Sequence, residues 1–332
     1  MADLKINLAC WMYDRTRALM DGSVKPEGID LIYHNLFPAI NFERQLRNKE
    51  FEVSELGLTF YIGTLDLPEP PFIALPIFPL RFFRHSAIYI NTNKGIKSPK
   101  DLIGRNVGEF FFFGHDAGLW AKGILAEHYG VPTDSVTYQV GGINHPTAEC
   151  TWLPFKPPAS HKITHIGDKL LGDMLEAGEI DALYSAITPP PMLKGSKNVA
   201  RLFPDYKAEE RGYYQKTGIF PIMHTLVMRR DVYKANPWIA QSIYNAFQQA
   251  KMNAWDMYKA GDAMMHGLFM MPWFTHHRDE IRQLMGEDVY PYGLEPNRKV
   301  LDTFCAYHHA QGLSKKLYKP EELFAPELLN IS

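Results

Sequence analysis

The hydrophobic positions of this chain fall into short apolar runs that alternate with segments of helical spacing. The runs have the length of β-strands and end at turn residues, and the segments between them repeat apolar residues every three or four positions. Strands that alternate with helices predict mainly parallel α/β sheets. The expected strands are residues 5–10, 29–33, 53–56, 72–78, 86–91, a strand opening at 106–108, 137–140, 180–184 and 225–229, and the expected helices among them are 41–49, 98–102, 116–129 and 168–177.

The last third of the chain has a different pattern. From Pro237 to Met271 the spacing is continuously helical, with an apolar face that includes Trp238, Ile243 and Phe247. Further helices are expected through residues 300–309. Residues 143–163 contain four prolines and no clear periodicity, which indicates an ordered loop or, alternatively, a lid.

Two α/β sets and a helical C-terminal section fit a chain that leaves one lobe, builds a second and returns. We expect lobe one to comprise residues 1–90 and 225–332 and lobe two residues 91–224, with crossing strands at 86–91 and 225–229. Open α/β sheets bind ligands at the carboxyl ends of their strands. A ligand cleft is therefore predicted where the two lobes face each other.

Composition and charge exclude several classes of protein. The 332 residues include 35 Lys and Arg and 37 Asp and Glu, with no Lys/Arg run, so we expect no nucleic-acid partner. No apolar stretch approaches 18 residues, and we expect no membrane span. The short apolar stretch at residues 6–12 ends at Tyr13-Asp14-Arg15, unlike a secretory signal, so we expect a cytoplasmic protein. The three cysteines do not indicate a disulfide framework.

Candidate binding residues follow two expected strands of the first lobe. Asp14 and Arg15 come after the first strand, and the planar fork of Arg15 suits a carboxylate. Alternatively, Asp14 caps a helix and Arg15 is solvated. Glu55 closes another strand, where it is either a general base, an orienter of a histidine or arginine, or a capping carboxylate.

The segment from Arg81 to Ser86 precedes a crossing strand. Arg81, Arg84, His85 and Ser86 lie there with two phenylalanines, which combines anion binding, ring stacking and proton transfer. A surface cluster of ion pairs is the alternative.

Four consecutive phenylalanines follow Glu109 in the second lobe and precede Gly114-His115. They cannot all face one core, because successive side chains of a strand point to opposite sides. Phe111 and Phe113, flanked by Glu109 and His115, therefore predict an aromatic wall for a flat ligand, with core packing as the alternative.

His224 precedes the returning strand, where it is either an interlobe residue or a core histidine. The pairs His161/His165, His276/His277 and His308/His309 lack the frame of a known metal motif, and no metal site is expected.

Several short motifs occur in one order along nearly the whole chain. They are Tyr13–Thr16, Val53–Leu56, Phe83–Ser86, Gly178–Leu183, Arg201–Pro204, Thr217–His224, Pro291–Gly293 and Tyr307–His309. Together they resemble the bacterial 4,5-dihydroxyphthalate decarboxylase family, which has the type 2 periplasmic-binding-protein fold. The resemblance implies an α/β protein of two lobes with an interlobe ligand cleft, and a cytoplasmic enzyme that removes one carboxylate from an aromatic dicarboxylic acid.

Two departures from the family pattern concern the second lobe. The family usually has a Glu-Tyr-Gln stretch with a nearby Thr-Ala, whereas here Glu109 is followed by phenylalanines, and only Glu109 and Trp120 match clearly. After Ser185-Ala186 the family often has an arginine before proline, and this chain has Ile187 there. These changes indicate a different, less charged substrate.

The resemblance also implies roles in decarboxylation. Arg15 and Arg84 would bind substrate anions, His85 or His224 would donate a proton to the ring, and Glu55 would orient that histidine or activate a phenol. No organic cofactor is expected, because a hydroxylated ring is its own electron sink. The partner would be a small aromatic acid, and a homo-oligomer is compatible with the sequence. A solute-binding receptor of a transporter, or another lyase or hydrolase on the same scaffold, are the alternatives.

The expected catalytic residues are His85, His224 and Glu55. The expected substrate-binding residues are Asp14, Arg15, Arg81, Arg84, Ser86, Glu109, Phe111, Phe113, His115 and Ser185.

Overall fold

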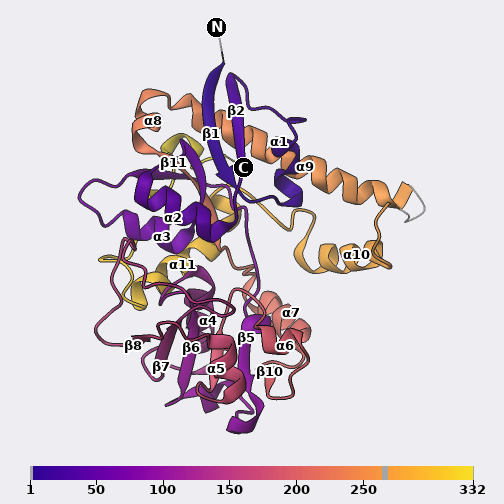
Figure 1. The fold of residues 1–332 in the computed structure, drawn as a ribbon. Coiled ribbons are helices and arrows are strands. Elements are labelled where there is room, and N and C mark those ends of the chain that lie inside the picture. The colour runs from indigo at the N-terminus through magenta and orange to yellow at the C-terminus, as the bar shows by residue number, and fades with distance from the viewer. Residues whose placement is uncertain (1–2, 264–267, 332) are drawn as a thin grey trace.

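The computed structural model describes residues 3–263 and 268–331, which form two β-sheets with helices around each (Figure 1). The strand order is β2-β1-β3-β11-β4 in the first sheet and β10-β5-β9-β6-β7-β8 in the second. This confirms the prediction of an α/β protein. The first sheet contains β1 (Leu4–Cys10), β2 (Ile29–Asn35), β3 (Val53–Gly57), β4 (Phe72–Leu75) and β11 (His224–Arg229). The second contains β5 (Ile88–Asn91), β6 (Asn106–Phe110), β7 (Thr137–Gly141), β8 (Lys162–His165), β9 (Ala182–Tyr184) and β10 (Val199–Arg201).

Both sheets are mixed. β1 runs parallel to β2 and β3, while β11 lies antiparallel between β3 and β4. β6 runs parallel to β7 and β9, and β7 to β8, while β5 is antiparallel to β9 and β10. The chain thus enters each sheet, after crossing between them, through an antiparallel strand. The division of the lobes at residues 90 and 224 stays a prediction; β5 pairs in the second sheet and β11 in the first.

The helices of the described residues pack around and between these sheets. They are α1 (Arg17–Met20), α2 (Pro38–Asn48), α3 (Leu58–Thr64), α4 (Asp116–Tyr129), α5 (Leu171–Ala177), α6 (Pro190–Leu193), α7 (Tyr206–Thr217), α8 (Arg230–Ala235), α9 (Trp238–Ala263), α10 (Phe274–Met285) and α11 (Arg298–Ala310). Short 3₁₀ turns lie at Asp14–Thr16, His85–Ala87, Thr92–Lys94, Pro99–Leu102, Glu295–Asn297, Pro320–Glu322 and Pro326–Leu328. Helix α5 ends at Gly178, whose φ of 75° is easily adopted by glycine.

Several expected elements are shorter than the sequence pattern. β4 stops at Leu75 because Pro76 has no N–H for the ladder. The helix expected over 237–271 is described from Trp238 to Ala263; residues 264–267 lie outside the described part, and 268–273 are not helical. The half-exposed strand β8 was not predicted, because its position at the edge of the sheet leaves it without an apolar run.

The two segments that cross between the sheets pair with each other. Arg81 and Ile222 form an antiparallel bridge, and the Phe82 N–H donates to the Pro221 carbonyl at 3.1 Å. Trp120 of α4 is fully buried and donates its Nε1–H to the Ile222 carbonyl at 2.7 Å. A helix of the second lobe is thereby tied to the segment that leads into His224.

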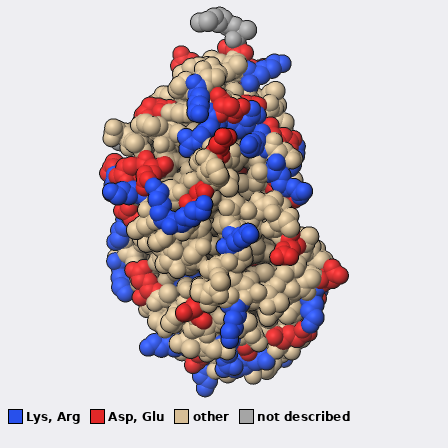
Figure 2. Space-filling model, turned by 90° about the vertical axis from the view of Figure 1, so that its left-hand side faces the viewer, with Lys and Arg blue, Asp and Glu red and all other residues tan. Residues whose placement is uncertain are grey.

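The outer surface carries both signs of charge. Lysine, arginine, aspartate and glutamate side chains are interspersed on the face shown in Figure 2. The end of α9 and the whole of α10 project from the body of the molecule (Figure 1), and Lys207 of α7 forms an ion pair with Glu280 of α10 at 3.3 Å. In the described part of the chain, no helix has both the length and the apolar character needed to cross a membrane.

Candidate active site

A cavity of about 330 Å³ lies between the two sheets. Its walls come from both lobes and from both crossing segments, after the carboxyl ends of β1, β6 and β9, where an open α/β sheet places ligands. Most of the lining is aromatic or aliphatic, and the ionisable groups are few. The lining residues are Trp11, Phe37, Pro38, Ala39, Phe42, Phe60, Leu80, Phe82, Arg84, Phe110, Phe111, Phe112, His115, Asp116, Ala117, Ala186, Ile187, Met223 and His224.

Glu55 and His224 form a hydrogen-bonded pair at this cavity. In the ladder Glu55 of β3 lies opposite Leu226 of β11, so His224 is its diagonal neighbour on the same face. The Glu55 Oε1 atom lies 2.6 Å from Nδ1 of His224 and accepts the Tyr13 hydroxyl, also at 2.6 Å. Its Oε2 accepts the Trp11 N–H at 2.9 Å.

These contacts set the charge of Glu55. Burial of the fully enclosed carboxyl opposes its ionisation, but the hydrogen bonds from His224, the Trp11 N–H and Tyr13 outweigh burial and lower the Glu55 pKa. An ionised Glu55 accepts the Nδ1–H of His224 and fixes the imidazole. Nε2 is then the ring nitrogen available for proton transfer, because Nδ1 is committed to Glu55.

Arg84 is a buried cation at the same cavity. Its residue is 4% exposed, and no hydrogen bond or ion pair to its side chain is found among the described residues. Its guanidinium lies 5.0 Å from the centre of the Phe82 ring. Burial lowers the Arg84 pKa to about 10, with Asp116 and Glu210 acting in the opposite direction. A desolvated guanidinium without a partner is well suited to bind a carboxylate.

Asp116 belongs to the cavity although the sequence interpretation did not select it. It is the first residue of α4, where an aspartate is ordinarily a helix-start residue, and that common role concealed it. Its Oδ1 accepts the Thr59 N–H at 2.8 Å, which connects the second lobe to α3 of the first. Burial raises its pKa, and the nearby His224 and the Thr59 N–H only partly oppose this.

The aromatic wall differs in one respect from the expected strand alternation. β6 ends at Phe110, and Phe111 has a φ of 70°, so the chain turns and Phe110, Phe111 and Phe112 all line the cavity. Phe113 does not line it; its ring lies 3.8 Å beneath Nζ of Lys122. The prediction that Phe113 contacts substrate is therefore corrected.

His115 and Glu109 occupy different positions around this wall. His115 lines the cavity, and its Nδ1 lies 3.4 Å from Oε1 of Glu109. Glu109 is fully buried and pairs with Lys122 Nζ at 2.5 and 2.6 Å. It thus holds the loop from behind and does not line the cavity. Ser185 does not line the cavity either; its Oγ accepts the N–H of Ile187 at 3.0 Å.

His85, predicted as one of two proton donors, lies in the core instead. It is fully buried among the rings of Tyr129, Phe203 and Tyr213 and does not line the cavity. Burial, assisted by His128, lowers its pKa to about 4, which leaves the imidazole neutral. His224 is then the histidine of the pair that reaches the cleft.

Arg81 and Ser86, two more residues of this segment, do not line the cavity between the lobes and instead bind other parts of the protein. The Arg81 guanidinium donates to the carbonyls of Phe220, at 3.2 Å, and Pro291, at 2.8 Å, and to Asn297. It holds the crossing segments to the C-terminal section. The Ser86 N–H donates to Glu210 at 2.8 Å, and its side chain borders a separate cavity of about 140 Å³.

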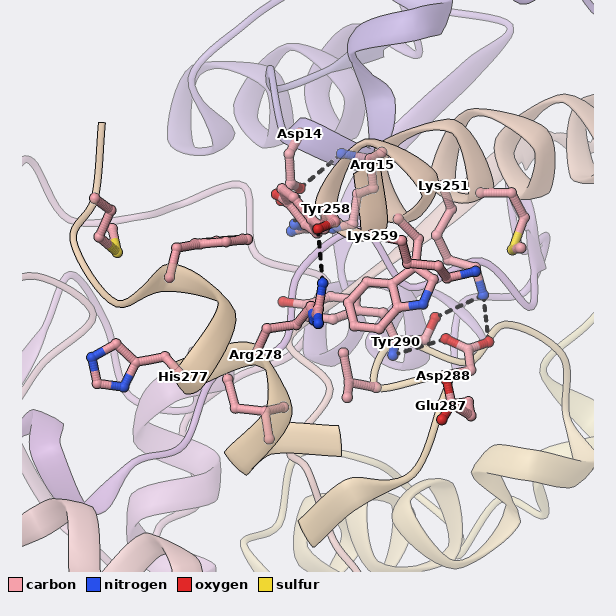
Figure 3. A pocket seen from close by; sticks show the side chains of 17 residues that line it. Asp14, Arg15, Lys251, Tyr258, Lys259, His277, Arg278, Glu287, Asp288 and Tyr290 are labelled. Atoms are coloured by element: carbon pink, nitrogen blue, oxygen red, sulfur yellow. Dashed lines mark hydrogen bonds and ion pairs between the residues drawn. The ribbon is translucent and has the colours of Figure 1, made fainter. Parts of the chain in front are cut away.

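Asp14 and Arg15 line a different and larger cavity, of about 530 Å³, between α9 and α10 (Figure 3). Arg15 donates to the Pro79 carbonyl at 2.7 Å and to Asp14 at 2.8 Å, and it lies 4.3 Å from the centres of the Tyr13 and Tyr290 rings. Arg15 therefore reaches Glu55 only through Tyr13, and its predicted contact with substrate is corrected.

The charged groups that line this larger cavity are paired with groups of opposite charge inside or beside it. Figure 3 shows Lys251 beside Asp288, with 2.6 Å between Nζ and Oδ2, and Asp14 beside Arg15. An acidic ligand would have to compete with these ion pairs for a cation, so this cavity is less suited to bind such a ligand than the cavity beside Arg84. Within the described ranges, no group of three or more His, Cys, Asp or Glu side chains could hold a metal ion.

Comparison with curated proteins gives two relatives of the same name. The chain is 32% identical over 332 residues to the 4,5-dihydroxyphthalate decarboxylase of Comamonas testosteroni, with 99% of this chain and 98% of that protein covered. It is 31% identical over 218 residues to that of Pseudomonas putida, with 65% and 83% covered. No protein-family model matches the chain.

Comparison with solved structures supports the fold. A periplasmic sulfonate-binding protein from Methylobacillus flagellatus superposes with a TM-score of 0.54 at 16% identity, covering 99% of this chain and 94% of the other. The alkanesulfonate-binding protein of Xanthomonas axonopodis, bound to MOPS, gives 0.53 at 11% identity, covering 98% of each. These similarities show the periplasmic-binding-protein type of fold, as expected from the sequence.

Proposed function

This chain belongs to the 4,5-dihydroxyphthalate decarboxylase family, and from that premise we propose that it is a carboxy-lyase acting on a dihydroxyphthalate-like aromatic acid in the cavity between its lobes. One structural observation supports the proposal independently of the sequence similarity. The buried Arg84 guanidinium, which has no hydrogen-bond or ion-pair partner among the described residues, lines the same aromatic cavity as the His224 imidazole, whose Nδ1 is held by Glu55. These groups suit an anionic, flat substrate that needs a proton.

The reaction requires one proton for each carbon dioxide released. His224 delivers the proton from Nε2 to the ring carbon that bears the carboxylate, while a ring hydroxyl in the ortho or para position supplies electron density. The new C–H bond forms, the bond to the carboxylate carbon breaks, and its electron pair returns to the ring. Glu55 stabilises the protonated imidazole and keeps Nε2 directed at the cavity.

The walls contribute by excluding water. Phe110, Phe111 and Phe112 from the second lobe face the cavity together with Phe42 and Phe60 from the first. A carboxylate beside these rings loses its water shell, whereas neutral carbon dioxide has little to lose. The change in charge during the reaction therefore favours the product in this environment. The Arg84 guanidinium binds an acid group of the substrate.

The decisive experiment measures carbon dioxide. Purified protein is incubated with 4,5-dihydroxyphthalate and a panel of hydroxylated aromatic acids, and released CO2 and the aromatic product are quantified. Release that disappears in the His224→Asn variant supports the proposal. A ligand that raises the melting temperature while no acid of the panel yields CO2 would instead favour a solute-binding receptor. Ligand at 100 times its Kd stabilises the fold by about 2.7 kcal/mol, so binding is measurable independently.

Two further expectations from the sequence belong to this proposal. We place the enzyme in the cytoplasm, which fractionation of cells expressing the native gene tests. A homo-oligomer is also compatible with the sequence, and sedimentation of the purified protein tests it.

A further inference from the structure

The cavity contains one arginine and an extensive surface that offers no second cation. Among the described lining residues, Arg84 is the only lysine or arginine, Asp116 is the only aspartate or glutamate, and the histidines are His115 and His224. The other cations that the sequence placed near a ligand have partners elsewhere. Arg81 is bound to the Phe220 and Pro291 carbonyls, and Arg15 to Asp14 and the Pro79 carbonyl.

The position of this single arginine matters for catalysis. A cation that binds the departing carboxylate stabilises the bound substrate more than the transition state, in which that negative charge moves into the ring. A cation that binds an acid group retained in the product keeps its contact throughout and orients the ring without this loss. The departing carboxylate is best placed against an apolar wall, where its charge is least stabilised.

On the basis of the function proposed above, we propose that Arg84 anchors an acid group that the substrate keeps, while the carboxylate that leaves lies against the Phe110–Phe112 wall without a cation. The enzyme then requires two acid groups on one ring and uses them differently. Arg84 is a positioning residue that determines specificity, and the aromatic wall selects which bond breaks.

His115 does not provide an equivalent second anchor. Its Nδ1 lies 3.4 Å from the Glu109 carboxylate, which is itself paired with Lys122, so any positive charge on His115 already faces an acid. His224 is likewise held by Glu55. In the described part of the chain, the cavity therefore has no unpaired cation for a second acid group of the substrate, and this arrangement promotes the departure of that group.

Two substrates that differ by one carboxylate test the inference. 4,5-Dihydroxyphthalate has two, and 3,4-dihydroxybenzoate has the same ring and hydroxyls with one. The wild-type protein is expected to decarboxylate the diacid with a kcat/KM at least about 100-fold higher, on the order expected when a bidentate charged contact is lost. The Arg84→Met variant should lose most of its activity toward the diacid and little toward the monoacid, so the ratio falls toward one.

The outcomes distinguish a failure of the proposed function from a failure of the anchoring role of Arg84. If neither compound nor any acid of the panel releases CO2, the proposed function fails. If the monoacid matches or exceeds the diacid, or if Arg84→Met lowers both rates by the same factor, decarboxylation stands and the anchoring role of Arg84 is wrong. The wild-type comparison remains decisive if the variant does not fold. As a control, Lys207→Met changes a surface cation away from the cavity and should leave both rates and their ratio unchanged.

Discussion

The carboxylate of Glu55 and the imidazole of His224 are joined at 2.6 Å across neighbouring strands, although 169 residues separate them in the chain. We expect His224→Asn to lower kcat by about 10²–10⁴-fold, because it removes the proton-transfer group. Glu55→Gln preserves the shape of the side chain and removes its charge, and we expect a loss of similar order. The double variant should be little worse than the more damaging single one, since the pair acts as a unit. If the fold-loss in kcat of the double variant for CO2 release equalled the product of the two single losses, the two residues would act independently and this linkage would be contradicted.

Arg84 and Arg81 are three residues apart and should respond differently to replacement by methionine. Arg84 has no hydrogen-bond partner among the described residues, so Arg84→Met should lower kcat/KM for the diacid while the free energy of unfolding stays equal or rises. Arg81→Met removes the donor to the Phe220 carbonyl and to Asn297 Oδ1, and one of the two donors to the Pro291 carbonyl, so it should cost about 2–5 kcal/mol of stability. Urea unfolding and steady-state kinetics of both variants check this. Equal destabilisation by the two changes would contradict the assignment.

His85 makes stability depend on pH. Its pKa falls from 6.5 in the unfolded chain to about 4 in the fold because of burial, so the unfolded state binds more protons between these values. Its stabilising contribution is complete above pH 6.5 and is lost as pH falls toward 4, by about 3 kcal/mol in total at 1.36 kcal/mol per pKa unit. The His85→Phe variant should show a smaller slope of unfolding free energy between pH 6.5 and 4. An unchanged slope would show that His85 is not buried as a neutral group.

The buried pair of Lys122 and Glu109 supports the aromatic loop. Lys122→Met removes the lysine from a fully buried carboxylate, which then keeps only the Gly114 N–H at 2.9 Å and the His115 ring at 3.4 Å, and this should cost about 3–5 kcal/mol in unfolding free energy. Adding Glu109→Leu should recover a large part of that cost, because the lone charge disappears as well. Thermal and urea unfolding of the single and double variants measure the recovery. A double variant less stable than Lys122→Met alone would contradict this account.

The sequence predicted the architecture and part of the site for physical reasons that act locally. Apolar runs and helical spacing identify most strands and helices. Glu55, Phe111 and His115 were selected because they follow strands, and Arg84 and His224 because they precede the crossing strands; the structure places all five at or beside the candidate cavity. Which of two neighbouring arginines faces the cleft depends on carbonyls contributed from residues 220 and 291, and no local pattern contains that information. The same holds for His85, whose surrounding rings come from residues 129, 203 and 213.

Two further differences between the predicted and the observed site come from backbone geometry and from a residue type that has more than one common role. Phe113 was assigned by strand alternation, but the positive φ of Phe111 ends that alternation two residues earlier. Asp116 looked like an ordinary helix start, and only its burial beside the cavity distinguishes it. These features appear when distant segments are packed together.

The order of strands in the first sheet also has a consequence for how the protein is made. β11 lies between β3 and β4 and is bonded to both, yet it comes about 150 residues later in the chain than β4. While the ribosome is still producing the second lobe, β3 and β4 each have an unpaired strand edge. The half of the molecule that emerges first is therefore completed last, and its edges are exposed to wrong pairing until β11 arrives.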